Sequence, residues 1–118
     1  MRRVRCGGAV MIREILHYQT TAGKDLFADW FEGLRDSRTM NRIEARLDRL
    51  ETGNFGDIKL VATGVWELRF HFGPGYRIYF GLDGEVLVIL LCGGDKSTQV
   101  SDIRLARESW RDYLRRTR

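Results

Sequence analysis

Cysteine is scarce in this sequence of 118 residues, and its two copies are poorly placed for chemistry. Cys6 lies in a glycine-rich stretch near the amino terminus, and Cys92 closes an apolar run. Neither position has the spacing of a disulfide framework or a metal site. Histidine is equally scarce, with only His17 and His71, so a zinc centre is not indicated. We therefore expect reduced thiols, no metal and no cofactor.

Long apolar runs are absent as well. The longest, from Val86 to Cys92, has the length of a strand and cannot cross a bilayer. The basic start MRRVRCGGAV is not followed by the apolar segment and cleavage site of a secretory signal. These absences predict a soluble cytoplasmic protein with no membrane partner.

Lysine is the third scarce residue. Only three of the 20 basic residues are lysines, so 17 are arginines, and the net charge is +4. A positive charge favours a polyanionic partner, and the planar guanidinium of arginine suits phosphate particularly well. A GC-rich genome would give the same bias, so composition is only weak support for such a partner.

The periodicity of the remaining residues predicts a single α+β domain. We assign residues 1–10 to a disordered leader or start-site extension and residues 11–118 to the domain. Residues 12–18 read as an edge strand. Two amphipathic segments predict an N-terminal αα-hairpin, packed on a sheet of about four to five strands, whose second helix has Ser37 as its N-cap and Gly53 after its end. The other predicted elements are a twisted, mainly antiparallel set of strands and a carboxy-terminal helix, at 58–62, 65–72, 76–82, 85–92 and 103–114.

The second predicted helix carries four arginines, namely Arg38, Arg42, Arg46 and Arg49. The favoured interpretation is a solvated helix face on which these side chains pair with acidic residues, namely Glu44, Asp48 and Glu51. The alternative is a surface for RNA phosphates or for a protein partner.

The stretch GVWELRFHFGPGYRIYF, residues 64–80, carries the strongest functional signal. With Gly73–Gly75 as the loop, His71 would lie opposite Arg77 and Arg69 opposite Tyr79. Pairing across a two-residue Asp83-Gly84 turn would set Leu90 beside Arg77 and Cys92 beside Gly75. The predicted result is one open polar face, within reach of Lys96 in the following loop, made of Glu67, Arg69, His71, Arg77 and Tyr79.

This face is either an ordinary solvent surface or a site for a phosphodiester. Cations, an aromatic side chain and a histidine favour the second interpretation, because histidine is the residue type that can take up or release a proton in catalysis. Cleavage of RNA without a metal requires a base, an acid and cations that stabilise charge on phosphorus. Glu67 or His71 can serve as the base and His71 or Tyr79 as the acid. The predicted electrostatic clamp consists of Arg69, Arg77 and Lys96.

The motifs GVWELRFHFGPGYRIYF and LCGGDKSTQVSDIRLA, with the closing Trp110, resemble the phage-derived Gp49-like, HigB-type addiction module killer proteins of the RelE/ParE toxin superfamily. The resemblance runs from about Met11 to Tyr113. It implies a RelE-like fold, the role of toxin in a type II toxin–antitoxin pair, and a helix-turn-helix antitoxin as partner. It also matches the family's basic positions to Arg69, Arg77 and Lys96.

Two departures from the RelE pattern affect the acid and base assignments. That pattern has a lysine where this chain has Glu67, and its tyrosine near the start of the last helix is replaced here by Asp102 or Ile103. Two functions therefore stay open. The first is a metal-independent endoribonuclease that cuts mRNA on the ribosome and inhibits translation. The second is a ParE-like, non-enzymatic inhibitor of DNA gyrase. His71 favours the first, because a binding surface needs no proton-transfer group.

Overall fold

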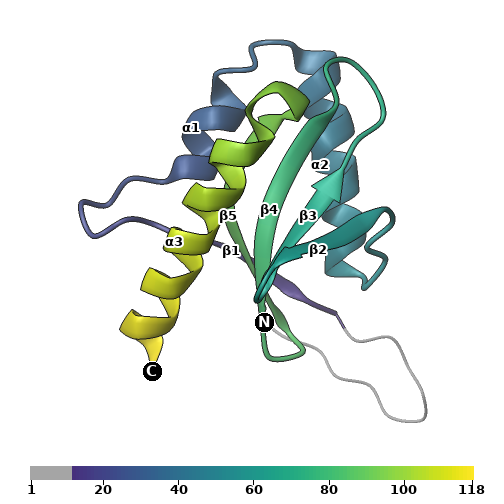
Figure 1. Ribbon diagram of the computed structural model, residues 1–118. Helices are drawn as coiled ribbons and strands as arrows, with labels where there is room; N and C mark the ends of the chain where they lie inside the picture. Colours follow the sequence, from purple (N-terminus) through teal and green to yellow (C-terminus); the bar gives the residue numbers. More distant parts are fainter. Residues whose placement is uncertain (1–11) are drawn as a thin grey trace, which may run out of the picture.

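The computed structural model describes residues 12–118, so the leader predicted for residues 1–10 lies outside the described residues. A five-stranded mixed sheet with strand order β1-β5-β4-β3-β2 forms the centre of the molecule (Figure 1). Its strands are β1 (Glu14–His17), β2 (Ile58–Ala62), β3 (Val65–Arg69), β4 (Tyr76–Asp83) and β5 (Leu87–Asp95). The helices are α1 (Leu26–Glu32), α2 (Ser37–Glu51) and α3 (Gln99–Thr117), with a short 3₁₀ turn, η1 (Lys96–Thr98), before α3.

The α+β class, the five strands and the carboxy-terminal helix confirm the prediction, whereas the order of elements needs a correction. The helical pair is not the first element, because β1 precedes it and pairs in parallel with β5. The other neighbouring strands are antiparallel. The N-cap of α2 is Asp36 instead of Ser37, while Gly53, with φ of 89°, follows the helix as predicted.

Helices cover both faces of the sheet. Phe27 of α1 and Ile43 of α2 belong to a core on one face that includes Leu68 and Phe80 of the sheet. The second core lies on the other face, where α3 packs Ala106 and Trp110 against residues that include Val65, Tyr79 and Leu91. Figure 1 looks onto α3, with the sheet behind it and α1 and α2 on the far side. Because both faces are covered, β5 is apolar on both sides, as its sequence predicted.

Glycines in the sheet let aromatic side chains approach the backbone closely. A Cβ atom on Gly81 would lie 2.4 Å from the Trp110 ring, and one on Gly93 would lie 2.2 Å from the Trp30 ring. Gly93 and Gly94 both belong to β5, although the sequence suggested a loop there. No helix within residues 12–118 is both long and apolar enough to span a bilayer.

Candidate phosphodiester site

The pairing of β3 with β4 decides which polar side chains share a face. Glu67 lies opposite Tyr79, and Arg69 lies opposite Arg77. The predicted register is therefore wrong by two residues. A shift of two leaves every side chain on its predicted face, because side chains alternate with a period of two. His71, in contrast, lies beyond the end of β3, so it does not sit opposite Arg77.

The pairing of β4 with β5 also differs from the prediction. Arg77 lies opposite Gly94, and Tyr79 opposite Cys92, after which the register shifts between Tyr79 and Phe80. Asp83 pairs with Leu87, so the turn has three residues where two were expected. The irregularity and the longer turn together move β5 along β4 and carry both glycines of the GGDK motif into the strand.

The face that holds these residues is not open, which corrects the prediction of an exposed patch. Glu67 is 1% exposed, Arg77 5% and Tyr79 0%. The reason is that apolar side chains on the same face, such as Val65 and Leu91, bind α3 over it. Tyr79 consequently cannot touch a ligand in solvent, which argues against its assignment as the general acid.

Glu67 is held in place from two sides. The Tyr79 hydroxyl donates a hydrogen bond of 3.0 Å to Oε2, and Nε2 of Gln99, the first residue of α3, donates one of 2.7 Å to the same oxygen. Burial and the charge of Glu67 raise the pKa of Tyr79 well above its usual value, so the phenol stays protonated and keeps donating. With its carboxylate buried and engaged, Glu67 is placed to orient Arg77 and is poorly placed to act as a base.

Arg77 ties this face to the hairpin loop. Its Nη1 donates to the carbonyl oxygens of Phe70, Gly75 and Tyr76 at 3.2, 3.0 and 3.0 Å. Its Nε lies 3.8 Å from Oε1 of Glu67. The guanidinium therefore fixes the shape of the loop in addition to supplying charge at the site.

A hollow of about 430 Å³ opens beside this pair. It lies between β2, β3, β4 and the start of α3, and its lining includes three cations, Lys59, Arg69 and Arg77, around the single carboxylate of Glu67. Excess positive charge in a concave site attracts phosphate. Lys59 and Gln99 were not predicted. The pairing of Lys59 with Glu67 across β2 and β3 is the signal that would have found the lysine.

His71 is not part of the lining of this hollow, but Asp57, a partner that was not predicted, links it to Arg69. Its Nε2 contacts Oδ2 of Asp57, and the same oxygen lies 3.6 Å from Nε of Arg69. The hydrogen bond from His71, with a further contribution from the charge of Arg69, lowers the pKa of Asp57. The His71 side chain is 64% exposed, so its ring is both oriented and accessible. Asp57 immediately precedes β2, and only the pairing of β2 with β3 reveals its position.

Lys96 lies against the tip of the same hairpin. It is exposed, and a Cβ atom on Gly75 would lie 2.9 Å from its Cγ, so its methylene groups cover that glycine. The structure thus brings Arg69 and Arg77 into one hollow and links His71 to it through Asp57 and Arg69. Lys96 stays at the hairpin tip and is not part of the lining, and Tyr79 is buried. Within residues 12–118, no three His, Cys, Asp or Glu side chains gather as a metal site.

Comparison with known proteins agrees with the resemblance found in the sequence. The family model of the phage-derived Gp49-like proteins matches residues 29–111. An uncharacterized protein of Haemophilus influenzae is 53% identical to this chain over 81 residues, which make up 69% of this chain and 82% of the relative. The matched segment includes β3, β4 and β5, and therefore the residues of the hollow.

Proposed function

The chain belongs to the phage-derived Gp49-like family, which is the HigB-type toxin family, and on that premise we propose that it is a toxin that cuts mRNA on the ribosome without a metal ion. Family membership suggests a toxin of a toxin–antitoxin pair and so an antitoxin partner. The cleavage activity, the ribosome as its place of action and a helix-turn-helix antitoxin are our proposal.

One observation carries the proposal: an oriented, accessible histidine stands next to a hollow with three cations. Arg69 joins the two parts, because it lines the hollow and also approaches Asp57, the partner of His71. A phosphate held by Arg69 and Lys59 would therefore lie close to the imidazole. Cations fixed before the reaction begins stabilise the charge that develops on phosphorus.

The reaction that fits this arrangement is attack of a ribose 2′-oxygen on the adjacent phosphorus. In the tautomer in which Nε2–H donates to Asp57, Nδ1 of His71 has the lone pair that takes the 2′-hydroxyl proton. The new O2′–P bond forms as the P–O5′ bond breaks, and the imidazolium returns the proton to the leaving 5′-oxygen. The products are a 2′,3′-cyclic phosphate and a 5′-hydroxyl.

The test compares the two histidines of the chain, each of which is paired with an aspartate. His71 contacts Asp57, whereas His17 contacts Asp25 at 2.7 Å, away from the hollow. After induction, new 5′ ends on a reporter mRNA are mapped by primer extension. We expect His71→Gln to reduce cleavage by about 10²- to 10⁴-fold, the usual contribution of a general acid–base group, and His17→Gln to leave it unchanged.

A gyrase supercoiling assay with the same proteins completes the experiment. If wild-type protein leaves the mRNA intact and blocks supercoiling, the protein is a gyrase inhibitor and the endonuclease proposal is wrong. If both histidine variants cut mRNA as well as wild type does, the nuclease activity is supported but His71 takes no part in its mechanism.

A further inference from the structure

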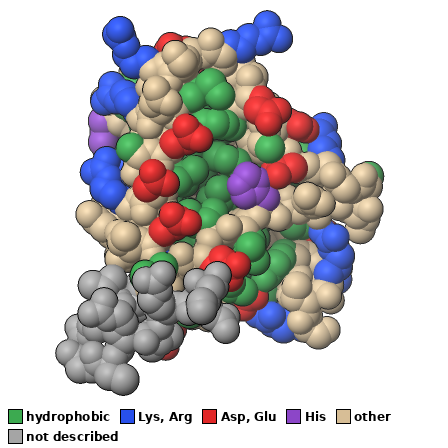
Figure 2. Space-filling view, turned by 180° about the vertical axis from the view of Figure 1, so that it is seen from behind, with side chains coloured by type: hydrophobic (Ala, Val, Ile, Leu, Met, Phe, Trp, Pro, Cys, Tyr) green, Lys and Arg blue, Asp and Glu red, His purple; other side chains and the backbone are tan. Residues whose placement is uncertain are grey.

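The charges on α2 are sorted onto two sides of the helix. Its arginines recur at spacings of three and four residues, and so do its acidic residues, which makes like charges neighbours along each stripe. The acidic stripe, Glu44, Asp48 and Glu51, lines a depression beside β1, and Figure 2 shows acidic side chains grouped on this face with basic ones along its edges. The two stripes therefore point away from each other.

Arg42, Arg46 and Arg49, which we call the arginine stripe, consequently form no ion pairs. Within residues 12–118, no carboxylate lies within 4.0 Å of a guanidinium of Arg42, Arg46 or Arg49. The predicted pairing with Glu44, Asp48 and Glu51 is wrong, because no arginine of α2 has an acidic residue three or four positions away on the helix. The predicted exposure is confirmed for three of the four arginines, Arg38, Arg42 and Arg49. The charge of Asp57 acts on Arg46 from beyond ion-pair distance, so the three arginines keep an excess of positive charge, which suits an anion.

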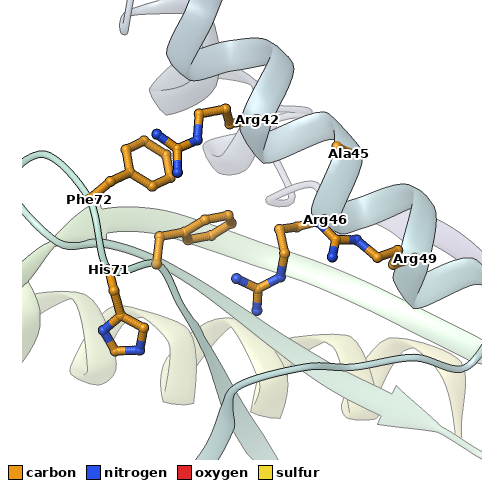
Figure 3. Close-up of a pocket in the computed structure, with 7 residues that line it drawn as sticks. Arg42, Ala45, Arg46, Arg49, His71 and Phe72 are labelled. Carbon is orange, nitrogen blue, oxygen red and sulfur yellow. The ribbon is translucent and has the colours of Figure 1, made fainter.

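These arginines line a second hollow, of about 260 Å³, between α2 and the segment after β3 (Figure 3). The guanidinium carbon of Arg42 lies 3.6 Å from the centroid of the Phe72 ring, and Figure 3 shows the two groups facing each other. That of Arg46 lies 4.7 Å from the centroid of Phe70. Stacking on a ring fixes the guanidinium plane while the N–H groups at its edge remain able to donate.

Arg46 has the most constrained of these guanidinium groups. Its Nη1 donates to the carbonyl oxygen of Arg69 at 2.9 Å, whereas its Nη2 is buried and has no hydrogen-bond partner among the described residues. Burial and the nearby charge of Arg49 lower its pKa. A buried donor without an acceptor costs free energy, so an anion that enters the hollow would be bound favourably.

We propose that this second hollow binds a backbone phosphate of the RNA substrate, at a nucleotide next to the one that is cut. The assignment to RNA rests on the proposed function. His71 lines this hollow and also contacts Asp57 at the candidate catalytic site. Arg46 donates a hydrogen bond to the carbonyl oxygen of Arg69, whose side chain lines the first hollow. A single strand passing the end of β3 would therefore meet both hollows. Phosphate contacts outside the reacting centre set the position of a nucleic acid in its site.

The test measures binding of a single-stranded 2′-O-methyl oligoribonucleotide, which lacks the attacking hydroxyl, by fluorescence anisotropy over a range of salt concentrations. Arg42→Gln and Arg49→Gln remove exposed members of the stripe. Arg104→Gln is the matched control, since Arg104 is exposed on α3 and lines neither hollow. For each stripe variant we expect the slope of log affinity against log salt to become shallower by about 0.7, the value for one phosphate contact on a single strand. The control should keep the wild-type slope.

Each outcome separates the second hollow from the proposed function. Equal slopes for all variants, with mRNA still cut by wild type, would overturn the phosphate site while the nuclease activity stays supported. Shallower slopes for the stripe variants, with no mRNA cleavage by wild type, would support the phosphate site and exclude the nuclease activity. Variants that bind the oligonucleotide normally but lose affinity for the antitoxin would show that the arginines bind an acidic protein segment, which also overturns the proposal.

Discussion

The Tyr79 hydroxyl and the Glu67 carboxylate form a hydrogen bond of 3.0 Å between two side chains that solvent scarcely reaches. The two residues lie opposite each other in β3 and β4, and α3 closes over both, adding Gln99 as a second donor to Glu67. A buried carboxylate is stabilised only while its hydrogen bonds persist. The polar layer under α3 is therefore part of the structural support of the cation hollow.

Replacing Tyr79 by Phe removes one of these donors while keeping the ring. We expect a loss of about 1–3 kcal/mol in the free energy of unfolding, because Glu67 is left partly unsatisfied. Urea denaturation measures this loss. Tyr113→Phe is the matched control, since its hydroxyl bonds to Asp83 at the margin of α3 and its loss should cost less. An unchanged midpoint for Tyr79→Phe would mean that water replaces the phenol.

The same hydrogen bond predicts how stability depends on alkaline pH. The folded pKa of Tyr79 is raised above its ordinary value of 10.0, so the unfolded chain loses this proton first. Its contribution to stability is fully present below pH 10 and declines as the pH rises toward the folded pKa. Denaturation midpoints should fall less steeply above pH 10 in Tyr79→Phe than in wild type.

Arg77 is expected to matter for folding as well as for activity. Its side chain is 6% exposed and holds three carbonyl groups of the hairpin loop. Arg77→Ala would leave Glu67 buried without its cation, a change that costs about 3–5 kcal/mol in comparable cases. The matched variant is Arg69→Ala, whose side chain is 32% exposed, and which should lose cleavage by about 10²-fold with little loss of stability. Thermal denaturation separates the two, and equal melting temperatures would contradict this assignment.

Sequence patterns predicted the strands, the helices and the identity of the polar residues, but they could not predict what covers those residues. Alternation along β3 and β4 placed Glu67, Arg69, Arg77 and Tyr79 on one face, and a two-residue error in register preserved that placement. The position of α3 depends on contacts with distant residues, which no local pattern reveals. Asp57 was missed for the same reason, since it reaches His71 only through the pairing of β2 with β3.

Trp110 and Gly81 should show strong energetic coupling. Trp110 is 7% exposed and stacks on Tyr113, and a Cβ atom on Gly81 would overlap its ring. We expect Trp110→Ala to lower stability by about 3–5 kcal/mol and Gly81→Ala by about 1–3 kcal/mol through overpacking. In the double variant the overlap disappears, so its loss should be smaller than the sum of the two. Strictly additive losses would show that the tryptophan moves aside without cost.

Asp57 provides the sharpest test of the proposed chemistry, because it can be altered without removing any group that touches RNA. Its carboxylate contacts Nε2 of His71 and lies 3.6 Å from Nε of Arg69. Asp57→Asn keeps the size of the side chain but can no longer fix the tautomer of the imidazole or stabilise its charged form. We expect cleavage to fall by about 10- to 100-fold, less than for His71→Gln, because the imidazole itself remains.

A readout other than cleavage distinguishes this positioning role from a structural one. Binding of the 2′-O-methyl oligonucleotide should be unchanged or tighter in Asp57→Asn, since a negative charge has been removed beside the cations. The lowered pKa of Asp57 means that its contribution to stability is present above its ordinary value of 3.8 and is lost as the pH falls through the folded value. Near neutral pH, the asparagine variant should therefore lose stability relative to wild type, and the difference should disappear in acid. Weaker oligonucleotide binding in parallel with weaker cleavage would show that Asp57 shapes the RNA surface, and would exclude a specific role in proton transfer.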